Sequence, residues 1–342
     1  MRGMVLVATA CVVVGCSGEP TDVVRRRDVH SLTGDTMGTT FSIKIVADSE
    51  AFDRFTIGSA IARRLDEIDA RMSHYRSDSE LVRFNRSRTT DPNPLAQETV
   101  DLVADAMAVS RVTRGAFDVT VGPLVNLWGF GPDHPPTTVP DDVVIAALRA
   151  SVGYELLEID RARSTLRKRH ADLSVDLSAI AKGYAVDAVA SLLAAAGWQD
   201  YLVEIGGELR GSGVGDHGGP WRVAIERPVP GTASLHRIIP LTNSAIATSG
   251  EYRNFYDRDG VRVSHTIDPR TGRPVTHRLA SVSVVADRCA IADARATALE
   301  VLGPDDGYTL AVEEGWAALF LVWDETGVLN ERSTPAFDRS VE

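Results

Sequence analysis

Apolar residues recur along this chain with two different spacings, which predict a mixture of helices and strands. Ile61, Leu65, Ile68 and Met72 lie three or four residues apart, which is the repeat of an amphipathic helix. The stretch 39–46 alternates instead and is rich in β-branched side chains, as half-buried strands are. We therefore expect a strand followed by a helix at the start of the folded part.

Further helices and strands follow without the strict alternation that a doubly wound parallel sheet needs. Helices are predicted around 100–107 and over 118–130, 141–150, 179–196 and 291–302. Strands are predicted near 154–159, 173–177, 201–205, 208–213, 221–226, 236–240, 245–249, 261–263, 281–286 and 316–323. This order predicts an α+β fold with largely antiparallel sheet, in one globular unit.

The first residues form a pattern of their own, which predicts export. Arg2 precedes an apolar run, 3–15, that is too short to cross a bilayer as a stable helix. The run ends in Val-Val-Gly-Cys, which resembles a bacterial lipobox whose cysteine, here Cys16, receives the lipid. We expect a signal peptide over 1–15 and a lipid-anchored protein facing the periplasm or cell surface. An uncleaved N-terminal anchor and an ordinary signal peptide are the alternatives.

Composition sets the limits of the folded part. With 342 residues, 44% of them hydrophobic, the chain can bury a substantial core. We predict a flexible tether over 16–33, one domain over 34–330 and a C-terminal tail over 331–342. The net charge of −11 argues against general nucleic-acid binding, which needs basic surface, and it is compatible with a cation site. Cys289 is the only cysteine after the leader, so no disulfide can form within the body.

Two oxygen-bearing side chains share one face of the predicted helix over 291–302. Asp293 and Thr297 are one helical turn apart, and hard cations such as Mg²⁺ and Ca²⁺ take oxygen ligands. The alternative is structural, because an aspartate near a helix start interacts favourably with the helix dipole and a threonine can bond its own backbone. Spacing alone leaves both open.

A second segment, DLSAIAKGYAVD, combines features of an anion cradle. Asp176 ends a predicted strand, Ser178 is a candidate N-cap, Lys182 lies one turn into the helix, and Gly183 allows close backbone approach. The glycine-rich loops of P-loop and Rossmann proteins are missing, so neither of those folds is favoured. A capped helix with a surface lysine is the alternative.

The stretch SHTIDPRTGRP, 264–274, places a histidine and a carboxylate where a strand is expected to run out into a tight turn. Pro269 biases Asp268 away from helical backbone angles, and Gly272 is a further turn signal.

Taken in order, ten segments of the chain resemble the ApbE family, the FAD:protein FMN transferases. The segments are MGTTFSI, RMSHYRSDSELVRFN, GAFDVTVGPL, VGY, DLSAIAKGYAVD, YLVEIGGELRGSG, WRVAIERP, IATSGEYRNFY, SHTIDPRTGRP and ADARATAL. The resemblance covers about residues 34–325, which is nearly the whole mature chain.

This resemblance implies an activity, a substrate and partners. It implies that FAD and Mg²⁺ bind, that the FMN moiety moves to a threonine or serine hydroxyl of an acceptor protein, and that AMP leaves. The acceptor it implies is a subunit of a sodium-pumping NADH:quinone oxidoreductase or of an Rnf-type complex. An FAD diphosphatase and a non-catalytic FAD-binding lipoprotein are the alternatives.

The resemblance also assigns roles to single residues. Asp293, Thr297 and the carbonyl of Ala179 match metal ligands, and His265 matches the residue that assists deprotonation of the acceptor hydroxyl. Asp268 is expected to orient the turn or the histidine. The positions that match flavin or adenine contacts are Met37, Tyr75, Ala116, Phe117, Asp118, Asp176, Lys182 and Ile267. His74 stands where many members carry threonine.

Overall fold

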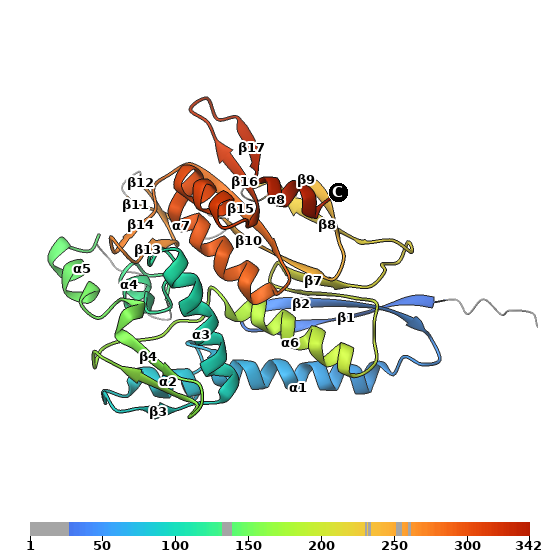
Figure 1. Ribbon diagram of the computed structural model, residues 1–342, viewed down its shortest axis with the longest axis horizontal. Helices are drawn as coiled ribbons and strands as arrows, with labels where there is room; N and C mark the ends of the chain where they lie inside the picture. Colours follow the sequence, from blue (N-terminus) through green and yellow to red (C-terminus); the bar gives the residue numbers. More distant parts are fainter. Residues whose placement is uncertain (1–26, 132–138, 230, 232–233, 251–254, 259–260) are drawn as a thin grey trace, which may run out of the picture.

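The structure is a computed structural model that describes residues 27–131, 139–229, 231, 234–250, 255–258 and 261–342 (Figure 1). The predicted signal peptide and the predicted lipidation site, Cys16, lie outside the described residues. Within them, no helix is both long and apolar enough to cross a membrane.

One antiparallel sheet, with strands of different lengths, forms the centre of the molecule. In the described part of the chain, eight strands pair in the order β1-β2-β6-β7-β10-β15-β16-β17, and every neighbouring pair is antiparallel. The strands are β1 (Arg27–Thr36), β2 (Thr39–Asp48), β6 (Tyr201–Ile205), β7 (Glu208–Ser212), β10 (Ser244–Gly250), β15 (Leu279–Ala286), β16 (Ala317–Trp323) and β17 (Leu329–Ser333). With the helices below, this confirms the predicted α+β class.

Helices cover one face of this sheet more fully than the other. The helices are α1 (Arg54–Met72), α2 (Glu80–Arg86), α3 (Gln97–Val112), α4 (Gly122–Leu127), α5 (Asp142–Arg149), α6 (Ala181–Ala195), α7 (Cys289–Glu313) and α8 (Pro335–Ser340). Ala247 of β10 belongs to the same buried cluster as Ala292 of α7. Its neighbour Ile246 points to the opposite face, where it clusters with Trp221 and with Phe337 of α8.

Nine further strands in the described part of the chain form four small sheets. These strands are β3 (Asn93–Pro94), β4 (Leu157–Asp160), β5 (Thr165–Lys168), β8 (Trp221–Glu226), β9 (Leu235–Leu241), β11 (Phe255–Arg258), β12 (Val261–Ser264), β13 (Ile267–Asp268) and β14 (Arg273–Pro274). The hairpins β11–β12 and β13–β14 lie beside α4 and α5 at one end of the molecule (Figure 1). Leu124, Trp128, Ile145, Val263 and Ile267 form the buried core of that end.

Both ends of the predicted domain were placed wrongly. Residues 27–33 were expected in the flexible tether, but they belong to β1, which pairs with β2 over its full length. β1 is an edge strand, so most of its side chains stay polar and its pattern is weak. The predicted tail, 331–342, contains part of β17 and all of α8, and Phe337 is fully buried.

Two internal predictions also differ from the structure. The helix predicted over 118–130 is confined to α4, Gly122–Leu127. The segment 173–177 alternates as a strand does, yet its backbone is not paired with another strand. The side chain of Asn85 takes that place, since Nδ2 donates to the Val175 carbonyl at 2.8 Å and Oδ1 accepts from the Val175 N–H at 2.8 Å.

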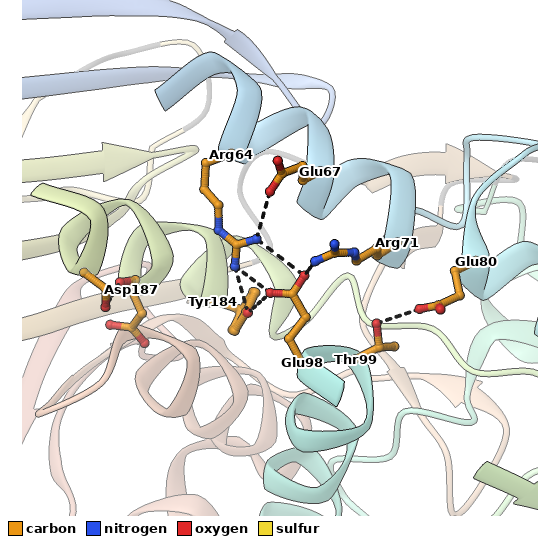
Figure 2. Close-up of polar contacts among 9 residues, drawn as sticks. Arg64, Glu67, Arg71, Glu80, Glu98, Thr99, Tyr184 and Asp187 are labelled. Atoms are coloured by element: carbon orange, nitrogen blue, oxygen red, sulfur yellow. Dashed lines mark hydrogen bonds and ion pairs between the residues drawn. The ribbon is translucent and has the colours of Figure 1, made fainter. Parts of the chain in front are cut away.

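A charged network ties α1, α3 and α6 together, as Figure 2 shows. Glu98 of α3 accepts from Arg64 at 2.5 Å, from the Tyr184 hydroxyl at 2.6 Å, and from Arg71. Arg64 also donates to the Tyr184 oxygen at 3.1 Å. These contacts join the second half of α1 to the first half of α6.

We predict that Phe337→Ala lowers the free energy of unfolding by about 3–5 kcal/mol, because a fully buried phenylalanine leaves a cavity when it is truncated. Phe55→Ala is the matched control, since Phe55 is 83% exposed and its loss should change stability by no more than about 0.5 kcal/mol. Urea denaturation followed by circular dichroism measures both. Equal stability of the two variants would mean that α8 is a dispensable tail.

Candidate active site

A cleft of about 1570 Å³ is lined by residues from many separate parts of the chain. It is lined by the β1–β2 turn, the segment after α1, the start of α6, the β6–β7 turn and one face of α7. All the catalytic, cofactor-binding and metal-binding residues predicted from the sequence line it except Asp268. These residues come from segments far apart in the sequence, so only the fold brings them together.

A lysine between two buried carboxylates forms the charged centre of the cleft. Lys182 donates a hydrogen bond to Glu208 Oε1, and its Nζ lies 3.9 Å from Asp293 Oδ1. Glu208 and Asp293 are each only 3% exposed. Buried carboxylates are tolerated when they are paired and hydrogen-bonded, and Lys182 supplies that charge to both.

Burial and charge shift the pKa values of this centre in different directions. Burial raises the pKa of Glu208 to about 7, although the nearby Lys182 ammonium opposes the shift. Burial likewise raises the pKa of Asp293, again against the effect of Lys182. For Lys182, burial alone would lower the pKa, but the two carboxylates outweigh it and the pKa is raised. The lysine therefore stays charged.

Asp293 is held in place by the helix that carries Lys182. The Gly183 N–H of α6 donates to Asp293 Oδ2 at 3.1 Å. A Cβ at Gly183 would lie 2.4 Å from the Cys289 carbonyl oxygen, so only glycine allows α6 and α7 to approach this closely. The glycine in the predicted anion cradle is thus explained by helix packing.

The oxygen donors near Asp293 fit a hard cation. Thr297 lies one turn further along α7, and its Oγ1 is 3.3 Å from Ser249 Oγ. Ala179 lines the same cleft, and the buried Glu208 Oε2 has no hydrogen-bond partner within the described chain. Among the described residues there is no group of three or more His, Cys, Asp or Glu side chains that could hold a metal. A cation here would need further oxygens from substrate or water, which is typical of Mg²⁺.

Glu208 is a residue that sequence reasoning missed. It follows Gly206 and Gly207, two glycines with positive φ that turn the chain from β6 into β7. A single glutamate after such a turn does not form a helical repeat or a metal-binding motif with its neighbours. The signal in the sequence was a glutamate at the start of a predicted strand. A glutamate that such a strand buries needs a charged or hydrogen-bonding partner.

The two predicted cofactor-binding aspartates organise one wall of the cleft. Asp118 accepts hydrogen bonds from the Thr120 N–H and hydroxyl and from the Tyr154 N–H, and burial raises its pKa. Asp176 accepts from the Ser178 N–H at 2.8 Å. These bonds fix the backbone on either side of the cleft wall.

An exposed aromatic side chain stands at the rim of the same wall. Tyr75 is 64% exposed, and its ring lies 4.1 Å from the ring of His74. His74 Nδ1 is in turn 3.4 Å from Asp176 Oδ1. A flat ring with an open face at the mouth of a cleft can stack on a flat ligand.

His265 and Asp268 follow β12 as expected, but they differ in where they point. His265 lines the cleft and lies edge-on to Phe130, with ring centres 6.2 Å apart. Asp268 Oδ1 and Oδ2 each accept a hydrogen bond of 2.9 Å from the Arg270 guanidinium. Asp268 does not line the cleft, and its backbone carbonyl accepts from the Gly272 N–H at 2.8 Å, so it holds the turn.

The arrangement can perform group transfer on a charged, elongated substrate. A half-buried ammonium beside oxygen donors can stabilise phosphate charge, and a histidine in the same cleft can move a proton. An antiparallel α+β scaffold with such a cleft differs from a nucleotide-binding Rossmann protein.

Comparison with known proteins identifies the family. The ApbE family model matches residues 37–320. A Vibrio cholerae protein named FAD:protein FMN transferase is 44% identical over 324 residues, covering 95% of this chain and 94% of its own length. A Klebsiella pneumoniae protein of the same name is 40% identical over 321 residues, covering 93% and 91%.

A solved structure agrees with these matches. The flavin transferase ApbE from Vibrio cholerae superposes with a TM-score of 0.85 at 44% identity, covering 92% of this chain and 99% of that chain. The chain therefore belongs to the ApbE family, and it is a transferase.

Proposed function

We propose that this protein transfers the FMN moiety of FAD to a threonine or serine hydroxyl of an acceptor protein, in a Mg²⁺-dependent reaction that releases AMP. The observation that carries the proposal is the meeting of Lys182, Asp293, Thr297 and His265 in one cleft. The names of the relatives support the same reaction, since each is called an FAD:protein FMN transferase.

The cleft residues have separate tasks in binding FAD. Tyr75 offers an aromatic face at the rim, and Met37, Phe117 and Ile267 offer apolar surface further along the cleft. Lys182 brings a positive charge to the diphosphate. Asp118 and Asp176 keep the backbone of the wall in shape through the hydrogen bonds described above.

The cation site would be made by Asp293, Thr297 and the carbonyl of Ala179, with the remaining oxygens from the diphosphate and from water. Bound there, Mg²⁺ would neutralise the negative charge that develops on the diphosphate. Lys182 adds a fixed positive charge to the same region, because its two carboxylate partners keep it protonated.

His265 serves as the general base. The acceptor oxygen forms a bond to the phosphorus of the FMN half, and the diphosphate P–O bond to AMP breaks. The hydroxyl proton passes to the imidazole of His265, and AMP leaves with the bridging oxygen. The chemistry balances without any oxidant or reductant.

Location and partner complete the proposal. A lipid on Cys16 would hold the enzyme on the outer side of a bacterial membrane, where the acceptor would be a subunit of a sodium-pumping NADH:quinone oxidoreductase or an Rnf-type complex. A membrane-held enzyme and a membrane-held acceptor meet in two dimensions, which raises their effective concentration.

Among the predictions of the proposed function, the first is a covalent mass gain. Incubation of residues 27–342 with FAD, Mg²⁺ and an acceptor domain should add one FMN mass to a threonine or serine of the acceptor. EDTA should abolish the gain, because the described residues alone offer too few ligands to hold the cation against a chelator. Intact-mass spectrometry measures it. Free FMN and AMP with an unmodified acceptor would instead indicate a diphosphatase, and unchanged FAD a binding protein.

The second prediction separates His265 from Asp268. His265→Ala should bind FAD normally yet transfer FMN about 10²–10⁴-fold more slowly, which is the range for loss of a general base. Asp268→Asn should lose far less, because its carboxylate bonds Arg270 outside the cleft. Single-turnover transfer rates at saturating FAD decide. A wild-type rate in His265→Ala would exclude the base assignment.

The third prediction concerns the anchor. Cys16→Ser should move the protein from the membrane fraction to the soluble fraction and should remove incorporation of a labelled fatty acid. If the acyl chains on Cys16 are the anchor, the serine variant carries none of them and should be released completely. Retention of Cys16→Ser in the membrane fraction would favour an uncleaved N-terminal anchor.

A further inference from the structure

α7 carries Asp293 and Thr297, yet it begins without a cap from its own sequence. Its N-cap residue, Arg288, makes no side-chain capping bond among the described residues, and the first turn of the helix holds no acidic residue. The first N–H groups of a helix need acceptors, above all when they are buried. Cys289 and Ala290 are both fully buried.

The missing cap comes from another helix. Asp187 of α6 accepts a hydrogen bond from the Cys289 N–H on Oδ1 and one from the Ala290 N–H on Oδ2, each of 3.0 Å. Arg210 of β7 donates to the same Oδ1 at 2.5 Å. A single carboxylate thus closes the start of α7 and is itself paired with a strand of the main sheet.

The two helices exchange matching contacts. A carboxylate of α6, Asp187, accepts from backbone N–H groups of α7, and a carboxylate of α7, Asp293, accepts from the Gly183 N–H of α6. Asp187 and Gly183 lie one turn apart on α6, and Cys289 and Asp293 lie one turn apart on α7. Two contacts at this spacing fix both the rotation of α7 and its position along its axis.

We propose that Asp187 is a positioning residue that sets where Asp293 and Thr297 lie relative to Ala179 and Lys182. The inference rests on the proposed function, since it concerns the cation site of that reaction. Asp187 does not line the cleft, so it acts only through α7. Changing a residue that orients metal ligands commonly weakens metal binding by about 10–100-fold.

The experiment measures cation binding directly, apart from turnover. Asp187→Asn keeps the shape but loses the charge and one of the two acceptor oxygens. Free Mn²⁺ is followed by electron paramagnetic resonance, with an FAD analogue whose diphosphate bridge is a methylene group. We expect the Mn²⁺ dissociation constant of Asp187→Asn to rise about ten-fold or more, with Asp293→Ala as the reference for loss of a ligand.

The matched control loses a helix cap elsewhere. Asp53 caps α1 by accepting from the Phe55 N–H at 3.0 Å and from the Thr56 N–H at 3.2 Å. Asp53→Ala removes that cap and should lower the melting temperature, yet leave Mn²⁺ affinity unchanged. Equal Mn²⁺ affinity in Asp187→Asn and wild type, or equal losses in the Asp187 and Asp53 variants, would overturn the proposal.

A second variant protects the test against a failure to fold. Gly183→Ala pushes the same two helices apart, since its Cβ would meet the Cys289 carbonyl, and it should also weaken Mn²⁺ binding. If Asp187→Asn does not fold, Gly183→Ala takes its place in the test. Mn²⁺ affinity equal to that of wild type in Gly183→Ala would then overturn the proposal. Wild-type protein that binds no Mn²⁺ would reject the metal-dependent function together with this inference. Normal wild-type binding with unchanged variants would reject this inference alone.

Discussion

The close approach of α6 and α7 at Gly183 is the constraint on which the active site depends. It brings the Asp293 carboxylate to the Gly183 N–H and places Lys182 beside two buried carboxylates. The two buried carboxylates would not be stable at that depth without Lys182, because an unpaired buried charge costs several kcal/mol. The packing of two helices and the pairing of the charges therefore support each other, and neither can change without the other.

The rest of the fold holds these two helices in place. Their apolar faces pack on the main sheet, and α6 is joined to α1 and α3 through Tyr184 and Glu98 (Figure 2). Arg210 connects β7 to Asp187 of α6, which in turn accepts from the first N–H groups of α7. Long antiparallel strands allow little sliding once their register is set, since a one-residue shift would turn every side chain to the other face. Rigid support of this kind suits the orientation of a diphosphate that we propose for this site.

Sequence patterns predicted the elements whose apolar residues recur with a regular spacing. They missed the elements that depend on single contacts between distant parts of the chain. The helix containing Ile61, Leu65 and Ile68 and the class of the fold were predictable because a buried face imposes a period. The segment 173–177 has the period of a strand, but one side chain, Asn85, satisfies its backbone. The edge strand β1 has almost no buried side chains to produce a pattern.

The candidate site divides in the same way. Asp293, Thr297, Lys182 and His265 could be found because each sits in a segment of distinctive composition, and the resemblance to the ApbE family joined those segments. Glu208 could not, since its importance comes from Lys182 on another element. The Lys182 ammonium near Asp293 should also repel a cation bound there, so that cation would bind weakly to the protein alone. In the proposed reaction the negative diphosphate of FAD would offset that repulsion, so binding of the substrate and binding of the cation would depend on each other.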